Sequence, residues 1–178
     1  MPGWFRRYCC LDARVAWLVA CISALAMAAP TLAADAPAPP SSQGTVTILG
    51  SPKVLHFDPD PEHVDWSWLI GIEWQQPDSR WHFGFSYFNN SFGQKCQFYY
   101  TGYKWTLSEH YPNWYFKLSG GLIYGYKDPY EDKVPFNHNG YSPGLFPALG
   151  YKWNRWNVQL VTLGTAGVMV TVGYDVIR

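Results

Sequence analysis

The sequence predicts an all-β protein, an eight-stranded antiparallel up-and-down transmembrane β-barrel. Three observations predict it: alternating side chains, an export leader and a surplus of aromatic residues. The alternation is clearest between Trp66 and Trp74, where every second residue is large and apolar. Because successive side chains of a strand point to opposite faces, one face is apolar and the other is small or polar. Aromatic residues make up 19% of the chain, and membrane barrels collect such residues in belts at both interfaces.

The leader is expected over residues 1–33. Three arginines precede an uncharged, mainly apolar run at 15–29, and small residues follow it. This pattern is typical of a cleavable export signal, and the run is shorter than the roughly 20 apolar residues of a spanning helix. A box ending at Cys21 is also similar to a lipoprotein cleavage site, so lipid attachment there stays an alternative. With the barrel pattern, the leader predicts a protein of the cell outer membrane.

The composition of the remaining chain excludes several classes of function. Residues 34–178 are enough for one domain, and they carry ten basic and twelve acidic residues with no basic cluster. We therefore expect no nucleic-acid partner. Cys96 is the one cysteine outside the leader, so the sequence predicts neither an internal disulfide nor a cysteine metal site. We expect a monomer without a cofactor.

A proline-rich, flexible segment at 34–44 precedes the predicted barrel at 45–178. The predicted strands are 45–57, 64–74, 80–89, 97–105, 114–126, 145–153, 156–163 and 168–177. The first is interrupted by Pro52, and short polar turns separate most of the others. Eight strands are the smallest usual number for a bacterial outer-membrane barrel. A soluble barrel, apolar inside and polar outside, is the alternative, but it leaves the aromatic surplus unexplained.

Candidate chemistry gathers at one rim of this barrel. An eight-stranded lumen holds side chains or one small ligand, which argues against a diffusion pore. His56 lies at the end of the first predicted strand, and Asn90 and Ser91 follow the third. Since odd-numbered strands of an up-and-down barrel end at the same rim, we expect these residues to converge. A serine hydroxyl beside a histidine base is the minimum for acyl transfer, and a polar third group can hold the imidazole.

Several segments resemble a known family when they are taken in order. Pro52 followed by His56, the stretch FNNSF at 88–92, GYKW at 102–105 and the proline-containing block 143–151 are similar to segments of the PagP-type lipid A palmitoyltransferases. The resemblance covers about residues 45–177. It implies an outer-membrane enzyme that moves a palmitoyl chain from a phospholipid donor to a lipid A acceptor.

The resemblance also implies roles for individual residues. It implies a catalytic set of His56, Asn90 and Ser91, an acyl-pocket floor at Gly102 and Lys104, and lateral lipid gates at Pro52, Pro143 and Pro147.

Two substitutions depart from the family and leave other functions open. Asn90 stands where the family has an aspartate, and an amide can orient a histidine without stabilising its charged form; Asp58 or Asp60 could supply a carboxylate instead. Lys104 replaces a floor glycine, which predicts a shorter acyl pocket than palmitate needs. Two alternatives to acyl transfer remain, a lipid A deacylase or esterase and a non-catalytic structural or lipid-binding barrel.

Overall fold

The computed structural model describes residues 43–58, 60–64 and 66–178. The expected leader, the Cys21 alternative and most of the proline-rich segment lie outside these residues. Within them no helix is both long and apolar enough to cross a bilayer.

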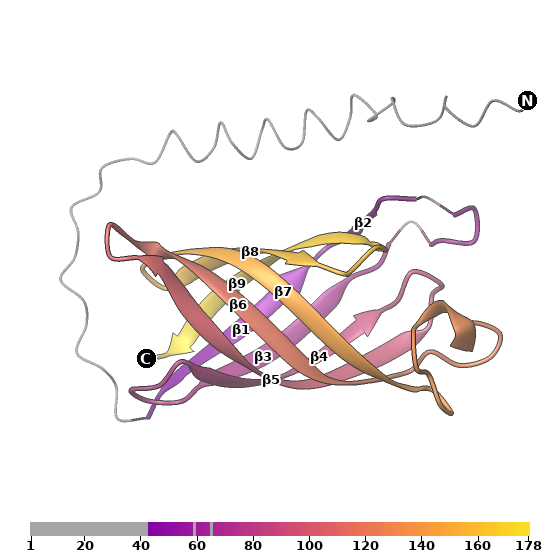
Figure 1. Cartoon of the computed structure of the whole chain (residues 1–178), viewed down its shortest axis with the longest axis horizontal. Coiled ribbons are helices and arrows are strands. Elements are labelled where there is room, and N and C mark those ends of the chain that lie inside the picture. Colours follow the sequence, from indigo (N-terminus) through magenta and orange to yellow (C-terminus); the bar gives the residue numbers. More distant parts are fainter. Residues whose placement is uncertain (1–42, 59, 65) are drawn as a thin grey trace, which may run out of the picture. The chain divides into compact units, whose positions relative to one another are not determined.

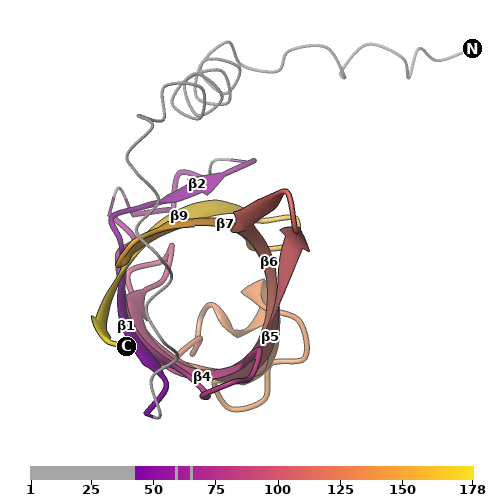
Figure 2. The ribbon, with the colours of Figure 1, turned by 90° about the vertical axis from the view of Figure 1, so that its left-hand side faces the viewer.

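The described chain is a closed antiparallel β-barrel (Figures 1 and 2). β1 pairs with β3, each strand from β3 to β8 pairs with the next along the chain, and β1 closes the ring by pairing with β9. The strands are β1 (Thr45–Ser51), β2 (Val54–His56), β3 (Leu69–Gln75), β4 (Trp81–Asn89), β5 (Lys95–Ser108), β6 (Tyr111–Tyr124), β7 (Tyr141–Trp153), β8 (Trp156–Thr162) and β9 (Gly167–Ile177), with a short 3₁₀ helix, η1 (Glu131–Lys133).

The predicted eight-stranded up-and-down barrel is confirmed. β1 and β2 are two parts of one strand, broken at Pro52, and both pair with β9. The break follows from the chemistry of proline, which has no N–H to donate to a ladder. In Figure 1 β2, the β4–β5 turn, the loop with η1 and the β8–β9 turn lie at one end of the barrel, which we call the mouth.

The barrel is apolar outside and largely polar inside, as the alternation predicts. Ile72 and Leu145, which are 50% and 65% exposed, represent the outer face. Thr47, Ser86, His82, Ser119, Gln159 and Thr171 are among the polar side chains buried within the barrel. A soluble barrel has the opposite arrangement, so the described strands fit an outer-membrane barrel.

Tryptophans gather at the end of the barrel opposite the mouth. Six strand ends there carry Trp74, Trp81, Trp105, Trp114, Trp153 and Trp156. Many of their rings contact another aromatic ring across the strands; for example, the ring centroids of Trp156 and Tyr174 are 4.8 Å apart. A belt of aromatic residues of this kind is typical of a barrel end at a lipid–water interface.

Paired charges fill the half of the lumen away from the mouth. The Lys117 ammonium lies 2.8 Å from the Glu73 carboxylate, and the fully buried Asp175 lies 2.7 Å from Lys152 and 3.2 Å from Arg178. Charges removed from water are strongly unfavourable unless they are paired in this way. The half of the lumen away from the mouth thus contains a network of buried, paired charges.

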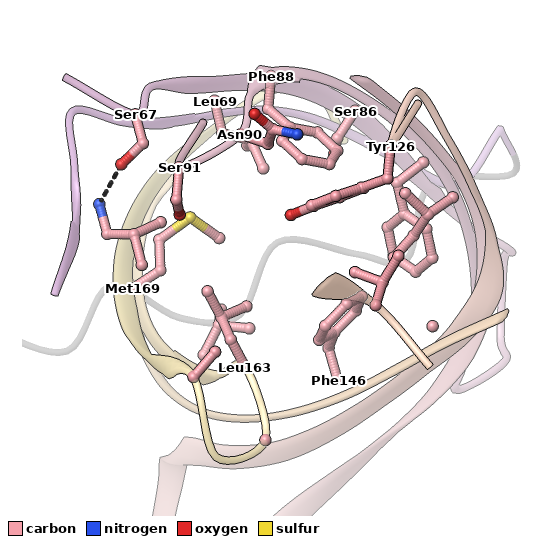
Figure 3. A pocket seen from close by; sticks show the side chains of 18 of the residues that line it. Ser67, Leu69, Ser86, Phe88, Asn90, Ser91, Tyr126, Phe146, Leu163 and Met169 are labelled. Carbon is pink, nitrogen blue, oxygen red and sulfur yellow. Dashed lines mark hydrogen bonds between the residues drawn. The ribbon is translucent and has the colours of Figure 1, made fainter. Parts of the chain in front are cut away.

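Tyr126 does not follow the alternation of its strand. The alternation of the fifth predicted strand places Tyr126 on the outer face with Tyr124, but β6 ends at Tyr124. Gly125 follows with φ +135°, a backbone conformation that other residues rarely adopt, and it reverses the facing of the next side chain. Tyr126 consequently points into the lumen (Figure 3).

Candidate functional site

A cavity of about 840 Å³ occupies the mouth half of the barrel. This volume falls in the usual range of ligand pockets. Its wall is mostly apolar, and Tyr126, Phe146, Leu163 and Met169 point into it (Figure 3). The cavity suits an apolar chain that enters from the mouth.

The floor of the cavity is polar and begins at Tyr100. The Tyr100 ring lies across the lumen over Gly84, where any Cβ would collide with it. Its hydroxyl donates to Glu73 at 3.2 Å, which joins the floor to the charged layer below. The other polar side chains lining this level are Ser86, Lys117, Ser119, Gln159 and Thr171. An apolar ligand must therefore end at about this level.

The two residues expected to form the floor lie elsewhere. Neither Gly102 nor Lys104 is among the residues that line the cavity. A Cβ at Gly102 would collide with the Leu118 carbonyl and with the His82 ring, so this glycine makes room for buried neighbours. Lys104 donates to Gln75 within the charged half of the barrel. Tyr100 precedes both on the inner face of β5 and closes the lumen nearer the mouth.

His56 and Ser91 meet at the mouth. β2 ends at His56 and β4 ends two residues before Ser91, so the two strand ends deliver both side chains to one place. The Nε2 atom of His56 lies 2.6 Å from Ser91 Oγ, and both residues line the cavity. With its hydrogen on Nδ1, the imidazole accepts the serine proton at Nε2, as a general base requires.

The surroundings of His56 favour a neutral imidazole. Burial, followed by the charges of His63 and Lys53, lowers the pKa of His56 from its ordinary value of 6.5. A histidine that acts as a base must be unprotonated at working pH, so this shift extends its range toward acid.

Asn90 serves the turn and not the histidine. Its Oδ1 accepts hydrogen bonds from the backbone N–H groups of Phe92 at 3.0 Å and Gln94 at 2.8 Å, and its Nδ2 donates to Gln94 Oε1 at 3.3 Å. Asparagine commonly closes turns through such bonds to its own backbone. In the described part of the chain no hydrogen bond joins Asn90 to His56, so the structure does not assemble the expected third member.

Among the described residues, neither of the aspartates after His56 takes the place of Asn90 by a hydrogen bond to the His56 ring. Asp58 and Asp60 line the cavity, and the Asp60 carboxylate accepts the backbone N–H of Glu62 at 2.9 Å. The ring in contact with His56 belongs to His63, and the two ring centroids are 4.1 Å apart. Sequence reasoning passed over His63, although a second histidine in the loop after His56 was a visible signal.

Strand pairing stops beside Pro52 on one side of the mouth. The β1–β3 ladder ends at the pair Ser51 and Leu69, and above it β2 pairs only with β9. One hydrogen bond crosses this gap, from Val54 N to Ser67 Oγ at 3.1 Å (Figure 3). Outside the gap, Pro52, Trp66 and Trp68 line a shallow groove.

A second break lies beside the other two prolines. β7 pairs with β8 only from Ala148 to Trp153, so its mouth-side half, which contains Pro143 and Pro147, has no ladder with β8. A bond from Thr162 Oγ1 to the Pro147 carbonyl, at 3.5 Å, lies at the upper limit of the hydrogen-bond range. All three expected gate prolines thus lie where the wall of the barrel is least held together by hydrogen bonds.

Comparisons with known proteins do not extend this picture: neither a scan against protein-family models nor a search of curated proteins finds a match to the chain. Among the described residues no group of three or more histidine, cysteine or acidic side chains is arranged to hold a metal ion.

Proposed function

We propose that this chain is an outer-membrane acyltransferase that moves an acyl chain from a phospholipid to lipid A. The observation that carries the proposal is the 2.6 Å contact between His56 Nε2 and Ser91 Oγ at the mouth of a cavity with an apolar wall. The ordered similarity to the PagP-type palmitoyltransferases names the donor and the acceptor.

The outer surface of the barrel supports a location in the membrane. Apolar side chains cover the outer faces of the strands, and a tryptophan belt surrounds one end. In water such a surface is unfavourable by about 25 cal/mol for each Å² of apolar area, whereas a bilayer removes that cost. The mouth then faces the surface at which phospholipid and lipid A head groups lie.

The breaks in strand pairing supply routes for lipid. An acyl chain that enters from above must bring its head group past the mouth, but a lateral opening lets the chain slide in from the bilayer. The gaps beside Pro52 and beside Pro147 both lie at the level of the cavity. We assign donor access and product release to these openings.

The proposed reaction is a double displacement. Ser91 Oγ attacks the donor ester carbonyl while His56 Nε2 takes its proton, and the tetrahedral intermediate then expels the lysophospholipid alcohol, which takes that proton back. A lipid A hydroxyl next gives its proton to His56 and attacks the acyl-serine. Collapse of the second intermediate forms the new ester and returns the proton to Ser91.

Mass spectrometry of lipid A tests the proposal. Cells that express the wild type should show lipid A with one added acyl chain. Ser91→Ala and His56→Ala should abolish this addition, whereas Ser108→Ala, at the other end of the barrel, should retain it. Lipid A that gains no acyl mass in cells with folded wild-type protein would refute acyl transfer, and lipid A that loses a chain would identify a deacylase instead.

One observation favours a second candidate, a lipid-binding barrel without chemistry. His56 has no carboxylate hydrogen-bonded to it among the described residues, and replacing the carboxylate of a serine protease by an amide lowers turnover by about 10⁴. On this alternative the purified wild type and Ser91→Ala retain equal amounts of phospholipid and neither changes lipid A.

A further inference from the structure

We propose that His63 is the positioning residue of this site, and that it holds His56 in the orientation in which Nε2 meets Ser91. The inference rests on the proposed function for its catalytic meaning, but the geometry on which it stands is independent of the substrate. It replaces Asn90, which the turn already uses.

The two histidine rings lie in close, tilted contact. Their ring centroids are 4.1 Å apart with an interplanar angle of 33°, so one face of the His56 imidazole is covered. The other ring neighbour of His63 is Phe92, whose centroid lies 5.2 Å away in an edge-on arrangement. His63 is thus wedged between the histidine and an aromatic residue next to Ser91 in the chain.

Hydrogen bonds fix the loop that carries His63. The backbone N–H of Asp60 donates to His63 Nδ1 at 3.3 Å, and His63 N donates to the Asp60 carbonyl at 2.9 Å. Val64 N then donates to the Ser91 carbonyl at 2.7 Å. The loop that holds His63 is therefore tied directly to the turn that holds Ser91, and His56 lies between them.

The hydrogen bond from the Asp60 N–H to His63 Nδ1 also fixes which ring nitrogen of His63 carries the hydrogen. Because Nδ1 accepts from Asp60, the neutral ring carries its hydrogen on Nε2. His63 thereby meets His56 through its face and cannot act as the carboxylate does in a Ser-His-Asp triad, by accepting the Nδ1 hydrogen of the base. It restricts the rotation of His56 and shields it from water.

The charges around the pair give His63 a second effect. Lys53 beside β2 lowers the pKa of His56, and Lys133 of η1 lines the cavity together with the carboxylates of Asp58 and Asp60. Two further cations, Lys95 at the start of β5 and Lys127 after β6, also lie at this end of the barrel. The β8–β9 turn against which β2 packs contributes no titratable side chain. A charge on His63 disfavours a proton on His56, in the opposite direction to a triad aspartate, and burial acts in the same sense.

The first test is an NMR titration of His56 in full-length mature protein in detergent micelles, with histidine side chains labelled. His63→Ala should raise the pKa of His56, because it removes both the electrostatic effect of the second imidazole and a covering ring. His63→Phe should raise it less, since the ring cover stays. His110→Ala, an exposed histidine at the other end of the barrel, should leave it unchanged. An unchanged His56 pKa in both His63 variants would overturn the proposal.

Acyl transfer supplies the second readout. His63→Ala should lower the rate on the order of ten- to a hundredfold through misplacement of the base, and the acidic limb of its pH profile should move to higher pH. His63→Phe should recover most of the rate lost by the alanine variant but keep part of the shift in the limb. Equal rates and limbs in wild type and His63→Ala would refute the positioning role.

The two proposals fail in distinguishable ways. If wild-type protein transfers no acyl chain, the proposed function fails, and the titration still decides whether His63 governs His56. If transfer occurs but His63 affects neither the titration nor the rate, the positioning role fails alone. Unheated gel mobility of each variant shows whether it has folded, and a variant that unfolds is replaced by His63→Phe, which keeps the packing.

Discussion

The depth of the cavity predicts a donor chain shorter than palmitate. Ser91 is five residues beyond Ser86, which lines the floor. At about 3.4 Å per residue along a strand tilted by about 40°, five residues correspond to a depth of roughly 13 Å. An extended saturated chain advances about 1.25 Å per bond, from a C–C bond of about 1.52 Å, so about ten bonds fit. We expect a preference for acyl chains of roughly ten to twelve carbons.

Raising the floor should shorten the preferred chain. Ala148 is 2% exposed, lines the cavity and pairs with Lys117 across the β6–β7 ladder, which puts it at floor level. Ala148→Leu adds three carbon atoms there and should shorten the preferred chain by about two or three carbons, and Ala148→Val by about one or two. Leu149→Ala, on the outer face of the same strand, should leave the preference unchanged.

The assay supplies purified protein with phospholipids of graded chain length and measures the mass added to lipid A. Preferred transfer of sixteen-carbon chains by the wild type would contradict the depth worked out above. Unaltered selectivity in folded Ala148→Leu would show that the chain does not end at this floor.

Three further predictions concern the base, the buried charges and the outer face. Because the pKa of His56 is lowered from 6.5, the midpoint of the acidic limb of wild-type activity should lie below pH 6.5, as His56 gains a proton; a midpoint above pH 6.5 would contradict this. Lys117→Met leaves the Glu73 carboxylate buried without its partner and should lower the free energy of unfolding in micelles by about 3–5 kcal/mol, much of which the additional change Glu73→Gln should restore. Ile72→Arg should make folding into bilayers less favourable by about 2–4 kcal/mol, while Gln76→Arg in the turn beyond β3 should have little effect. Equal effects of the two substitutions would argue against a lipid-facing wall.

The barrel could be predicted from sequence because its signal is repeated in every strand. Alternation gave the number of strands and the facing of most side chains, and the break at Pro52 followed from one missing donor. Tyr126 shows where the alternation fails. Gly125 before it has a positive φ, which turns the next side chain to the opposite face, and the sequence alone does not show which φ a glycine adopts.

The site could be predicted only in part. Strand direction brings His56 and Ser91 to one rim, and the structure puts their atoms in hydrogen-bond contact. Asn90 was harder, because one amide can close a turn or orient an imidazole, and the choice depends on where Gln94 lies. To predict the floor of the cavity, one must know where the Tyr100 ring lies in the lumen, and sequence similarity at Gly102 and Lys104 does not show this. His63 reaches His56 through the fold of its loop, which has no repeat to read.

The buried ion pairs in the half of the lumen away from the mouth close the lower end of the cavity. Because paired charged side chains occupy the lumen below the cavity, a gap in the wall beside Pro52 or Pro147 leads into a pocket and not into a channel along the barrel axis. On the proposed function, a lipid that enters through the wall therefore reaches Ser91 without any passage through the barrel having to open.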